Sequence, residues 1–526
     1  MTPDPAGWPC PTGAEMRAID GDAIGRLGIP GRTLMEAAGR AVADAIARFY
    51  PERRRPLVVC GSGNNGGDGY VVARALVEQG RGLRPRVLEL GRFERQSPES
   101  KANRDLLQSA GVPVVEGPGP AALADALAQS DLVVDAVFGV GLARPVEAAI
   151  AGALDALGRS GVPIVAVDLP SGLSSDTGQP LGVDLDPECV VTLGLPKLGL
   201  ALWPSRARVL VADIGLPRES LERVAPRQHL LTRRAARALL PARPLAAHKG
   251  TFGHALAVGG ALGKTGAALL AAQGALRAGA GLVTIAAPRA LVPIFASRLP
   301  EAMCAVLDDG GSGALAPGHA VAIAGEAGLR DAAVLGPGLG HSAATAELAR
   351  ALATRIGVAA VIDADALNAF AGDPEGLRSG AARILTPHPG EAARLLGTGN
   401  AEIQADRAGA ARALAQRSGA VVVLKGARSV VAHLDGRLSI NPTGGPGLAA
   451  GGSGDVLAGA LGALLARGLS PWDAARLGVY LHGLAGDLGP LQGGLASELA
   501  GRLPAAWQAL AAEESPDEPG TLHPFP

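Results

Sequence analysis

The chain contains two separate series of short apolar runs, and within each series the runs alternate with longer alanine-rich stretches. The first series occupies residues 57–60, 86–90, 132–138, 164–168, 190–193 and 209–214, and the second occupies residues 255–258, 282–286, 333–335, 360–363, 383–386 and 421–424. Short runs separated by helical stretches are typical of βαβ units, in which neighbouring strands are parallel. The sequence therefore predicts an α/β fold with two parallel sheets.

The alternation breaks between the two series, which predicts a domain boundary. With 526 residues the chain exceeds the size that one hydrophobic core usually serves. We expect a Rossmann-like domain over residues 1–217, a linker over 218–228 and a second α/β domain over 229–512. Residues 513–526 are rich in acid and proline, which predicts a disordered tail.

Composition narrows the expected partners to small molecules. The 48 basic residues nearly balance the 49 acidic ones, and only 3% of the residues are aromatic, so we expect neither a nucleic acid nor a membrane as partner. No apolar run approaches the roughly 20 residues that span a bilayer. The first residues lack the features of a signal peptide, and the scattered cysteines fit a reducing compartment. We therefore expect a cytoplasmic protein.

Lysine is rare in this chain, and its positions are informative. Only five of the 48 basic residues are lysines, namely Lys101, Lys197, Lys249, Lys264 and Lys425. Where arginine is the usual cation, we expect a retained lysine to be needed as a compact ammonium, as at phosphate sites. All except Lys101 lie within the motifs described below.

A glycine-rich segment, G-S-G-N-N-G-G-D-G, follows the first run at residues 61–69. Its glycines fit the G-x-G-x-x-G pattern of dinucleotide-binding turns, which by itself favours a dehydrogenase with a helix over residues 70–79. Pyrophosphate binding needs neither asparagine nor aspartate, and an aspartate would repel a phosphate. Asn64, Asn65 and Asp68 therefore indicate another use of the same turn.

Two further runs of the first series end in carboxylates. Asp135 precedes the segment 138–145, and Asp168 comes shortly before Ser171. Because ligands bind beyond the carboxyl ends of parallel strands, we expect these loops and the glycine-rich turn to converge. Asn64 and Ser171 have an alternative role, which is to satisfy the backbone of their turns.

These segments, together with residues 34–39 and 195–199, closely resemble NAD(P)H-hydrate epimerases. The likeness covers nearly all of residues 12–217 and implies a Rossmann-like fold. It also implies a potassium ion whose ligands are Asn65, Asp135 and Ser171. Carboxylate, amide and hydroxyl oxygens are ligands that hard cations accept.

The same resemblance implies a binding site for a hydrated nicotinamide nucleotide. Its residues are Asn64, Asn65, Gly66, Gly67, Asp68, Gly139, Val140, Gly141, Leu142, Ala143, Arg144, Pro145 and Asp168. Epimerising a carbon that bears both nitrogen and hydroxyl requires proton movement at that hydroxyl. We therefore expect Asp168 to be the catalytic acid or base.

A second glycine-rich loop, G-G-S-G-D at residues 451–455, precedes a predicted helix over 456–465. A turn of small residues at a helix start faces its N–H groups toward an anion, while Asp455 can take a proton from a hydroxyl. This combination is typical of phosphoryl transfer. The other motifs of this half lie at residues 248–253, 259–266, 336–340, 363–368, 386–391 and 424–426. The first of them contains His248 and Lys249, for which packing and phosphate binding are both open.

In this order the motifs resemble ribokinase-like ADP- or ATP-dependent NAD(P)H-hydrate dehydratases over about residues 229–510. The resemblance implies that the hydrated dinucleotide contacts Ala267, Gly338, His388 and Asp455, and that the adenine nucleotide, used with Mg²⁺, contacts Lys425, Gly426, Ala427, Arg428, Ser429 and Gly454. We expect Asp455 to be the catalytic base. His388 has an alternative role as a turn residue that caps backbone. Lys264 departs from the family, which often has an aromatic residue nearby.

Together the resemblances imply a bifunctional enzyme that repairs hydrated NADH and NADPH. One half would interconvert the R and S epimers of NAD(P)HX, and the other would dehydrate the S epimer at the expense of ADP or ATP. The rival interpretation is a kinase of the hydroxymethylpyrimidine type fused to a nucleotide-binding module. A kinase would release a phosphorylated product, whereas a dehydratase releases inorganic phosphate. We also expect a homo-oligomer.

Overall fold

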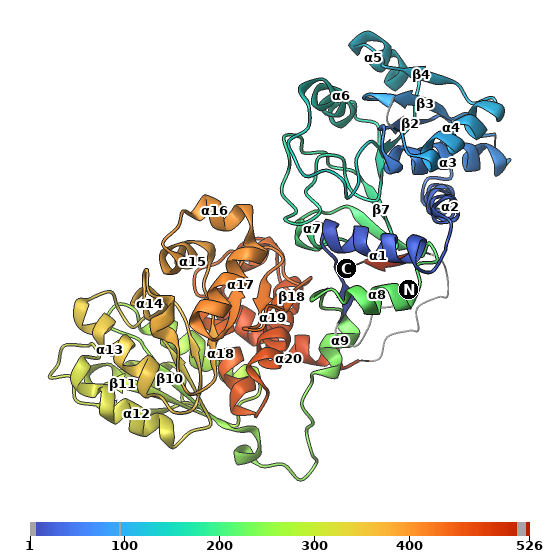
Figure 1. The fold of residues 1–526 in the computed structure, drawn as a ribbon. Helices are drawn as coiled ribbons and strands as arrows, with labels where there is room; N and C mark the ends of the chain where they lie inside the picture. The colour runs from blue at the N-terminus through green and yellow to red at the C-terminus, as the bar shows by residue number, and fades with distance from the viewer. Residues whose placement is uncertain (1–6, 81, 94–95, 513–521, 526) are drawn as a thin grey trace. The chain divides into compact units, whose positions relative to one another are not determined.

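The structure is a computed structural model that describes residues 7–80, 82–93, 96–512 and 522–525. The chain forms two compact units (Figure 1). Unit 1 contains residues 8–229 and 522–525, and unit 2 contains residues 230–512. Both units combine helices with largely parallel sheets, which confirms the predicted α/β fold. Within the described ranges, no helix has both the length and the apolar character needed to traverse a bilayer.

Unit 1 is built on one sheet. Its strands are β2 (Pro56–Cys60), β3 (Arg86–Glu89), β4 (Val114–Glu116), β5 (Leu132–Ala136), β6 (Ile164–Val167), β7 (Cys189–Leu193), β8 (Arg208–Ala212) and β19 (Leu522–Phe525). Their order is β19-β8-β7-β6-β5-β2-β3-β4, and every neighbouring pair is parallel except β19 with β8. The chain leaves β2 toward β3 on one side and returns at β5 on the other, and in such sheets ligands bind at the loops where the strand order reverses.

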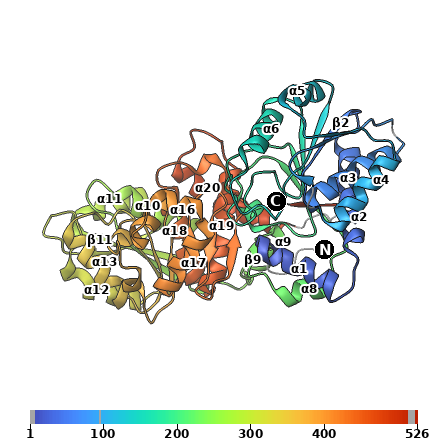
Figure 2. The same ribbon diagram turned by 45° about the horizontal axis from the view of Figure 1, so that its top comes forward.

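Helices cover both faces of this sheet. They are α1 (Gly13–Gly25), α2 (Gly31–Phe49), α3 (Asn64–Glu78), α4 (Pro98–Ser109), α5 (Pro120–Ala128), α6 (Ala148–Arg159), α7 (Leu198–Leu202) and α8 (Arg218–Val224). Successive strand residues point to opposite faces. In β2, Val58 and Cys60 therefore pack with α2 and α3, whereas Leu57 and Val59 pack with α5 and α6 (Figure 2). Burial on both faces explains why the strand reads as a continuous apolar run.

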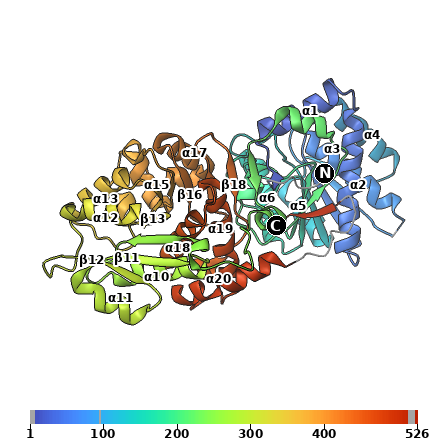
Figure 3. The ribbon, with the colours of Figure 1, turned by 90° about the horizontal axis from the view of Figure 1, so that it is seen from below.

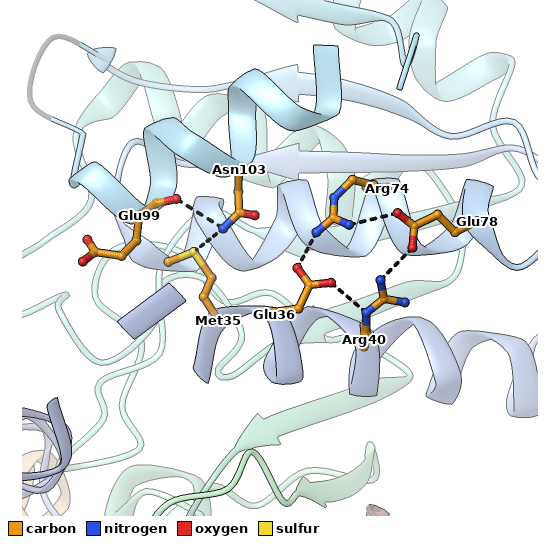
Figure 4. Close-up of polar contacts among 7 residues, drawn as sticks. All are labelled: Met35, Glu36, Arg40, Arg74, Glu78, Glu99 and Asn103. Atoms are coloured by element: carbon orange, nitrogen blue, oxygen red, sulfur yellow. Dashed lines mark hydrogen bonds and ion pairs between the residues drawn. The ribbon is translucent and has the colours of Figure 1, made fainter. Parts of the chain in front are cut away.

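Polar contacts join α2, α3 and α4 on one face of the sheet (Figure 4). A ring of ion pairs is formed by Glu36 and Arg40 of α2 with Arg74 and Glu78 of α3. In this ring Arg40 lies 2.7 Å from both Glu36 and Glu78. Asn103 of α4 donates a hydrogen bond to the Met35 sulfur of α2 at 3.1 Å. These contacts orient α3, whose first turn contains residues predicted to bind substrate.

Unit 2 also has a mainly parallel sheet. Its strands are β10 (His254–Val258), β11 (Leu282–Pro288), β12 (Met303–Leu307), β13 (Ala332–Leu335), β14 (Ala359–Ile362), β15 (Arg383–Leu385), β16 (Val421–Leu424), β17 (Val430–Ala432) and β18 (Leu438–Ile440). They follow the order β18-β17-β16-β15-β14-β13-β10-β11-β12. The pairs β16–β17 and β17–β18 are antiparallel, and the others are parallel. The chain crosses between the units near the short strands β1 (Trp8–Pro9) and β9 (Gln228–Leu230).

Two helical layers enclose the sheet of unit 2 (Figure 3). The helices are α9 (Arg233–Ala238), α10 (Thr265–Arg277), α11 (Val292–Arg298), α12 (Ala320–Gly328), α13 (Ala343–Arg355), α14 (Asp365–Asn368), α15 (Pro389–Leu396), α16 (Asn400–Ala405), α17 (Arg407–Ser418), α18 (Ser453–Ala466), α19 (Pro471–Asp487) and α20 (Ala496–Ala511). Helix α18 is buried from Val456 to Ala466 and packs against α10, α19, β13 and β14. A helix that is apolar all round belongs in a core, so the start of α18 is firmly held.

The first glycine-rich segment differs from its expectation. A helix was expected from residue 70, but α3 already begins at Asn64. A Cβ on Gly66 would lie 1.8 Å from the carbonyl oxygen of Gly61, so glycine is required there by close packing rather than by a turn. The pattern that predicts a loop is thus largely the first turn of a helix.

The C-terminal segment also differs from its expectation. Of the predicted disordered tail, residues 513–521 and 526 lie outside the described residues, but residues 522–525 form β19 and pair with β8. Phe525 is 8% exposed, so burial of its ring accompanies this pairing. In the predicted linker 218–228, residues 218–224 form helix α8, and the units divide after His229.

Candidate active sites

The buried polar residues predicted in unit 1 gather at one edge of its sheet. Asn65 follows β2, Asp135 lies near the end of β5, and Asp168 and Ser171 follow β6. These three strands are adjacent and parallel, so their carboxyl ends meet. None of the four side chains is more than 9% exposed.

Asp135 and Ser171 are joined directly. The Ser171 hydroxyl donates to Asp135 Oδ1 at 2.6 Å, and the Ser171 N–H donates to Asp135 Oδ2 at 2.8 Å. The Phe138 N–H donates to the Ser171 hydroxyl at 2.8 Å. Burial raises the pKa of Asp135 to about 6, although the Ser171 bonds oppose this shift. The pair ties together the loops that follow β5 and β6.

The Asn65 amide is buried beside these loops. Within the described residues no group accepts a hydrogen bond from its Nδ2, and the oxygen and nitrogen of an amide can be interchanged. A Cβ on Gly139 would lie 3.2 Å from Asn65 Oδ1 and 3.0 Å from Asp168 Oδ2, so both side chains face Gly139. The oxygens of the Asn65 amide, the Asp135 carboxylate and the Ser171 hydroxyl are ligand types that a hard cation such as potassium accepts. Among the described residues, no group of three or more His, Cys, Asp or Glu side chains forms a metal site of another kind.

Asp168 is held in a special backbone conformation. Its φ of 70° lies in the left-handed region, which is uncommon for residues other than glycine. Its Oδ1 forms a buried ion pair with Lys197 and accepts a hydrogen bond from the Leu193 N–H at 3.1 Å. The Lys197 side chain is 1% exposed. The predicted acid or base is thus paired with one of the rare lysines.

Two more carboxyl groups share this environment. Burial raises the pKa of Asp68 well above its usual range, and Asp168 and Asp20 add to the shift. Burial likewise raises the pKa of Asp20 to about 6, while Lys197 opposes this shift. Asp20 lies on α1, and sequence reasoning missed it because no motif surrounds it. Lys197 was noted as a rare lysine within residues 195–199, but no role was predicted for it.

The outer predicted residues of unit 1 are more open. Asn64 is exposed and accepts a hydrogen bond from the Ser97 hydroxyl at 2.6 Å. Most of the loop 139–145 is exposed or half-buried, and the Arg144 side chain is 81% exposed. Of this loop, Gly139 is the part that lies against Asn65 and Asp168. The loop is thus placed above the buried groups, where a ligand can reach it.

In unit 2 three adjacent strands of the sheet also end in polar residues. Asp363 follows β14, Thr386 follows β15, and Lys425 follows β16. Their backbones continue the ladder beyond the strands, because the Thr386 N–H donates to the Ile362 oxygen at 3.2 Å and the Lys425 N–H donates to the Pro387 oxygen at 2.9 Å. The register places Asp363 level with Thr386, and Lys425 lies two residues farther along β16.

Lys425 is the centre of the charged cluster in unit 2. Its Nζ lies 3.0 Å from Asp363 Oδ1 and 3.8 Å from Glu391 Oε2. Burial by itself would lower the pKa of Lys425, but Asp363 and Glu391 outweigh it and raise that pKa. A Cβ on Gly454 would lie 3.4 Å from Lys425 Nζ, so the ammonium faces the start of α18.

Asp455 completes this cluster from the first turn of α18. Burial raises the pKa of Asp455 to about 7, Asp363 adds to the shift, and Lys425 opposes it. A carboxyl group with a pKa near neutrality is well suited to proton transfer at physiological pH. The start of α18, the Lys425 ammonium and the Asp455 carboxyl group are together the kinds of group that phosphoryl transfer uses.

The predicted nucleotide-binding residues 425–429 form the turn between β16 and β17. Arg428 has a φ of 53°, and the Ser429 hydroxyl donates to the Gly426 oxygen at 2.9 Å. Arg407, at the start of α17, donates to the Ala427 oxygen, and its Nη2 would lie 2.9 Å from a Cβ on Gly426. Arg407 thus contacts this turn and stabilises it. Arg407 lies outside every motif found in the sequence.

A second polar group surrounds Asp365, at the start of α14. Asp365 Oδ2 accepts from the Gly340 N–H at 2.8 Å and pairs with Lys264 at 3.2 Å. His341 Nδ1 lies 3.2 Å from Asp365 Oδ1. A Cβ on Gly338 would lie 3.0 Å from the Ala267 side chain, so these two predicted substrate residues are neighbours. Lys264 therefore has a carboxylate partner, and Ala364, which precedes Asp365, is another residue with positive φ, at 51°.

The two histidines of doubtful role cap backbone. His388 Nδ1 accepts from the Gly390 N–H at 3.0 Å, and burial lowers the pKa of His388. His248 Nδ1 accepts from the Gly250 N–H at 3.1 Å. In the motif at residues 248–253, the Phe252 ring packs against the Arg243 and Arg467 guanidinium groups.

The sequence also missed His482 of α19. His482 is 7% exposed, and its Nε2 lies 2.9 Å from the carbonyl oxygen of Ser453, the first residue of α18. Burial lowers the pKa of His482 to about 4, so the neutral ring donates this bond.

In unit 1, a cavity of about 920 Å³ lies between α5 and α6. None of the predicted site residues lines this cavity.

Two family profiles match the chain. Residues 31–199 match the family described as YjeF-related protein N-terminus. Residues 255–505 match the family described as NAD(P)H-hydrate dehydratase. The two matches fall in different units.

Similar proteins cover nearly the whole chain. The bifunctional NAD(P)H-hydrate repair enzyme Nnr of Moorella thermoacetica is 44% identical over 94% of this chain and 94% of its own length. The protein of the same name from Thermofilum pendens is 38% identical over 94% of this chain and 96% of its own length. A solved structure of the ADP/ATP-dependent NAD(P)H-hydrate dehydratase of Bacillus subtilis, co-crystallized with ATP and Mg²⁺, is 32% identical over 53% of this chain and 98% of that chain, with a TM-score of 0.46.

Proposed function

This chain belongs to the family of bifunctional NAD(P)H-hydrate repair enzymes, and from that premise we propose how its two sites divide the two reactions. The enzyme interconverts the R and S epimers of NAD(P)HX and dehydrates the S epimer to NAD(P)H with ADP or ATP. We assign epimerisation to a domain over residues 1–217 and dehydration to a domain over residues 229–512, with residues 218–228 between them. The observation that carries this assignment is the convergence of Asp455, Lys425 and the start of α18.

Dehydration begins with the transfer of a phosphoryl group to the substrate hydroxyl. Asp455 takes the hydroxyl proton, and the oxygen attacks the terminal phosphate of the nucleotide. Lys425 and the N–H groups at the start of α18 stabilise the charge that develops on the phosphate. Loss of inorganic phosphate from one ring carbon and of a proton from its neighbour then restores the ring double bond.

The remaining residues of unit 2 bind the two ligands. Residues 425–429 and Gly454 hold the adenine nucleotide, and Ala267, Gly338 and His388 contact the hydrated dinucleotide together with Asp455. Arg407 donates a hydrogen bond to the Ala427 oxygen and so holds the turn 425–429 in place. This contact supports a binding role for the backbone groups of the turn.

Mg²⁺ is proposed to accompany the nucleotide. It is usually held by one or two carboxylates together with substrate phosphates, and Asp363 and Glu391 are the carboxylates beside Lys425. These residues fit that requirement. When bound, the ion neutralises phosphate charge.

Epimerisation is proposed to use Asp168 as the acid or base. The neighbouring carboxyl and amide groups, at residues 64–68, and the loop 139–145 contact the hydrated nicotinamide nucleotide. Asp168 supports this role by its position beside Gly139 and by its strained backbone.

A potassium ion is proposed beside the same site. Asn65, Asp135 and Ser171 would hold it, and the unsatisfied Asn65 amide supports this choice. The ion would supply positive charge next to an anionic nucleotide. We further propose a cytoplasmic location, because the four cysteines form no disulfide within the described residues. The homo-oligomer stays a prediction.

One assay tests the proposed function. The purified chain is given mixed NADHX epimers with ADP or ATP, and the return of NADH absorbance and the release of inorganic phosphate are followed. We expect both epimers to be recovered as NADH, with one phosphate released per NADH. Recovery of the S fraction alone would contradict the epimerase assignment. A stable phosphorylated product would contradict the dehydratase mechanism. Comparison of ADP with ATP decides the preferred nucleotide.

A further inference from the structure

Lys197 lies in the interior of unit 1 with a complete set of partners. Its side chain is 1% exposed, and an ammonium can donate three hydrogen bonds. Three acceptors surround its Nζ. They are Asp168 Oδ1, the Thr192 hydroxyl at 3.3 Å from Nζ and the Leu193 carbonyl oxygen at 2.9 Å from Nζ. A lysine is rarely buried in this way without a paired charge.

The two oxygens of Asp168 have different surroundings. Oδ1 accepts from Lys197 and from the Leu193 N–H at 3.1 Å. Within the described residues no hydrogen bond to Oδ2 is present, and this oxygen faces Gly139 at the start of the loop 139–145. One oxygen is therefore used for anchoring, and the other remains open toward the loop assigned to substrate.

Two further carboxyl groups interact electrostatically with Asp168 and Lys197. Asp20 of α1 and Asp68 of α3 are the other titratable groups that interact with Asp168 and Lys197. Burial raises the pKa of Asp68 well above its usual range and that of Asp20 to about 6. Three carboxyl groups and one ammonium thus share a buried space, and the ammonium contacts Asp168 alone among the three.

We propose that Lys197 is a positioning residue for epimerisation, which holds Oδ1 of Asp168 in an ion pair and so directs Oδ2 toward the bound substrate. This inference rests on the proposed function of unit 1. The carbon that changes configuration bears nitrogen and hydroxyl, so its reaction begins with loss of the hydroxyl proton. That proton passes to Oδ2, and the C–O bond becomes a carbonyl as the C–N bond breaks.

The electron pair of the broken bond stays on nitrogen, which takes a proton from the carboxyl group of Asp68, whose pKa burial raises well above its usual range. Ring closure on the opposite face of the carbonyl returns both protons and gives the other epimer. No other reactant is consumed. This exchange requires one group that accepts a proton and another that donates one.

The test compares three variants of the full chain. In Lys197→Met the ammonium is lost, in Lys197→Arg the charge is kept, and in Lys101→Met the same change is made at an exposed lysine of α4. Interconversion of the epimers is followed by chromatography without nucleotide from pH 5 to pH 9. Dehydration of pure S epimer with ATP, which uses the other unit, reports the integrity of each preparation.

We expect Lys197→Met to lower epimerase kcat by about 10²-fold at neutral pH, and the rise of activity with pH to move to higher pH. Lys197→Arg should keep the wild-type pH profile at a lower rate, and Lys101→Met should match the wild type. A Lys197→Met profile that is wild-type in shape, whether at full or at uniformly reduced rate, would overturn the inference. If that variant does not fold, a shifted profile in Lys197→Arg would overturn it instead. A wild-type chain that leaves the epimers unchanged would overturn the proposed function, and this inference with it.

Discussion

At the scale of single residues, Asp455 has the clearest assigned role. We expect Asp455→Asn to lower the rate of dehydration by about 10²- to 10⁴-fold, because the change removes a base but keeps the size of the side chain. Nucleotide affinity should change little, since the glycine turn is intact. Turnover of S-NADHX and ATP binding by calorimetry measure the two effects. Near wild-type turnover would remove Asp455 from the mechanism.

The pKa of Asp455 also predicts a pH dependence. Burial raises this pKa to about 7, and the base acts in its ionised form. Dehydration kcat/KM should therefore fall about tenfold per pH unit well below pH 7 and level off above it. The measurement is the initial rate at low S-NADHX between pH 5.5 and 8.5. A rate that does not change between pH 6 and pH 8 would contradict the ionisation assigned to Asp455.

The sequence predicted the chemical residues that stand at strand ends. Asp135 and Asp168 lie at or near the ends of adjacent parallel strands of unit 1, so their convergence could be expected from the sheet alone, and Lys425 follows a strand of unit 2 in the same way. Asp20 and His482 could not be found in this way, because they lie on helices and reach the sites only through tertiary packing. Their positions in the sequence of a helix do not distinguish them from helix residues without a functional role.

At the scale of elements, the glycine-rich segment at residues 61–69 shows why the start of a helix can be misplaced from sequence alone. Glycine is read as a turn residue, but in the first turn of α3 it is needed because the backbone of Gly61 approaches Gly66 closely. The order of strands and helices was predictable because each has its own apolar pattern. The start of α3 depends on a contact between two loops, which a local pattern does not contain.

The loops after β2, β5 and β6 predict a cation effect. Replacing potassium by lithium at equal ionic strength should lower the melting temperature of unit 1, because an ion bound only by the folded state stabilises it. Asn65→Ala should remove most of this difference, and it disturbs little else because the Asn65 amide nitrogen has no partner among the described residues. Calorimetry in the two salts measures both.

Asn64→Ala is the matched control, because Asn64 is exposed and bonded to Ser97. It should keep the salt difference. Equal melting of the wild type in potassium and lithium would argue against the cation site, and would leave Asp135 as the residue that ties two loops together.

At the scale of the whole molecule, β19 makes unit 1 discontinuous in sequence. Ending the chain at Ala512 should lower the melting temperature of unit 1, because β8 loses its neighbour and Phe525 its burial. Dehydration of S-NADHX should be unchanged. Phe525→Ser should reproduce part of the loss, whereas Pro524→Ser, at an exposed position of the same strand, should not. Unaltered melting after truncation would show that β19 contributes nothing to stability.

The pairing of β19 with β8 also has a consequence for biosynthesis. The ribosome completes β8 before it begins unit 2, and residues 230–512 take roughly 15 to 60 s to make at about 5–20 residues per second. During that interval the nascent sheet presents an unpaired edge, which is a template for association with other chains. Fragments released by interrupted translation would keep this edge. Chaperones and proteases could thereby distinguish unfinished copies from finished ones.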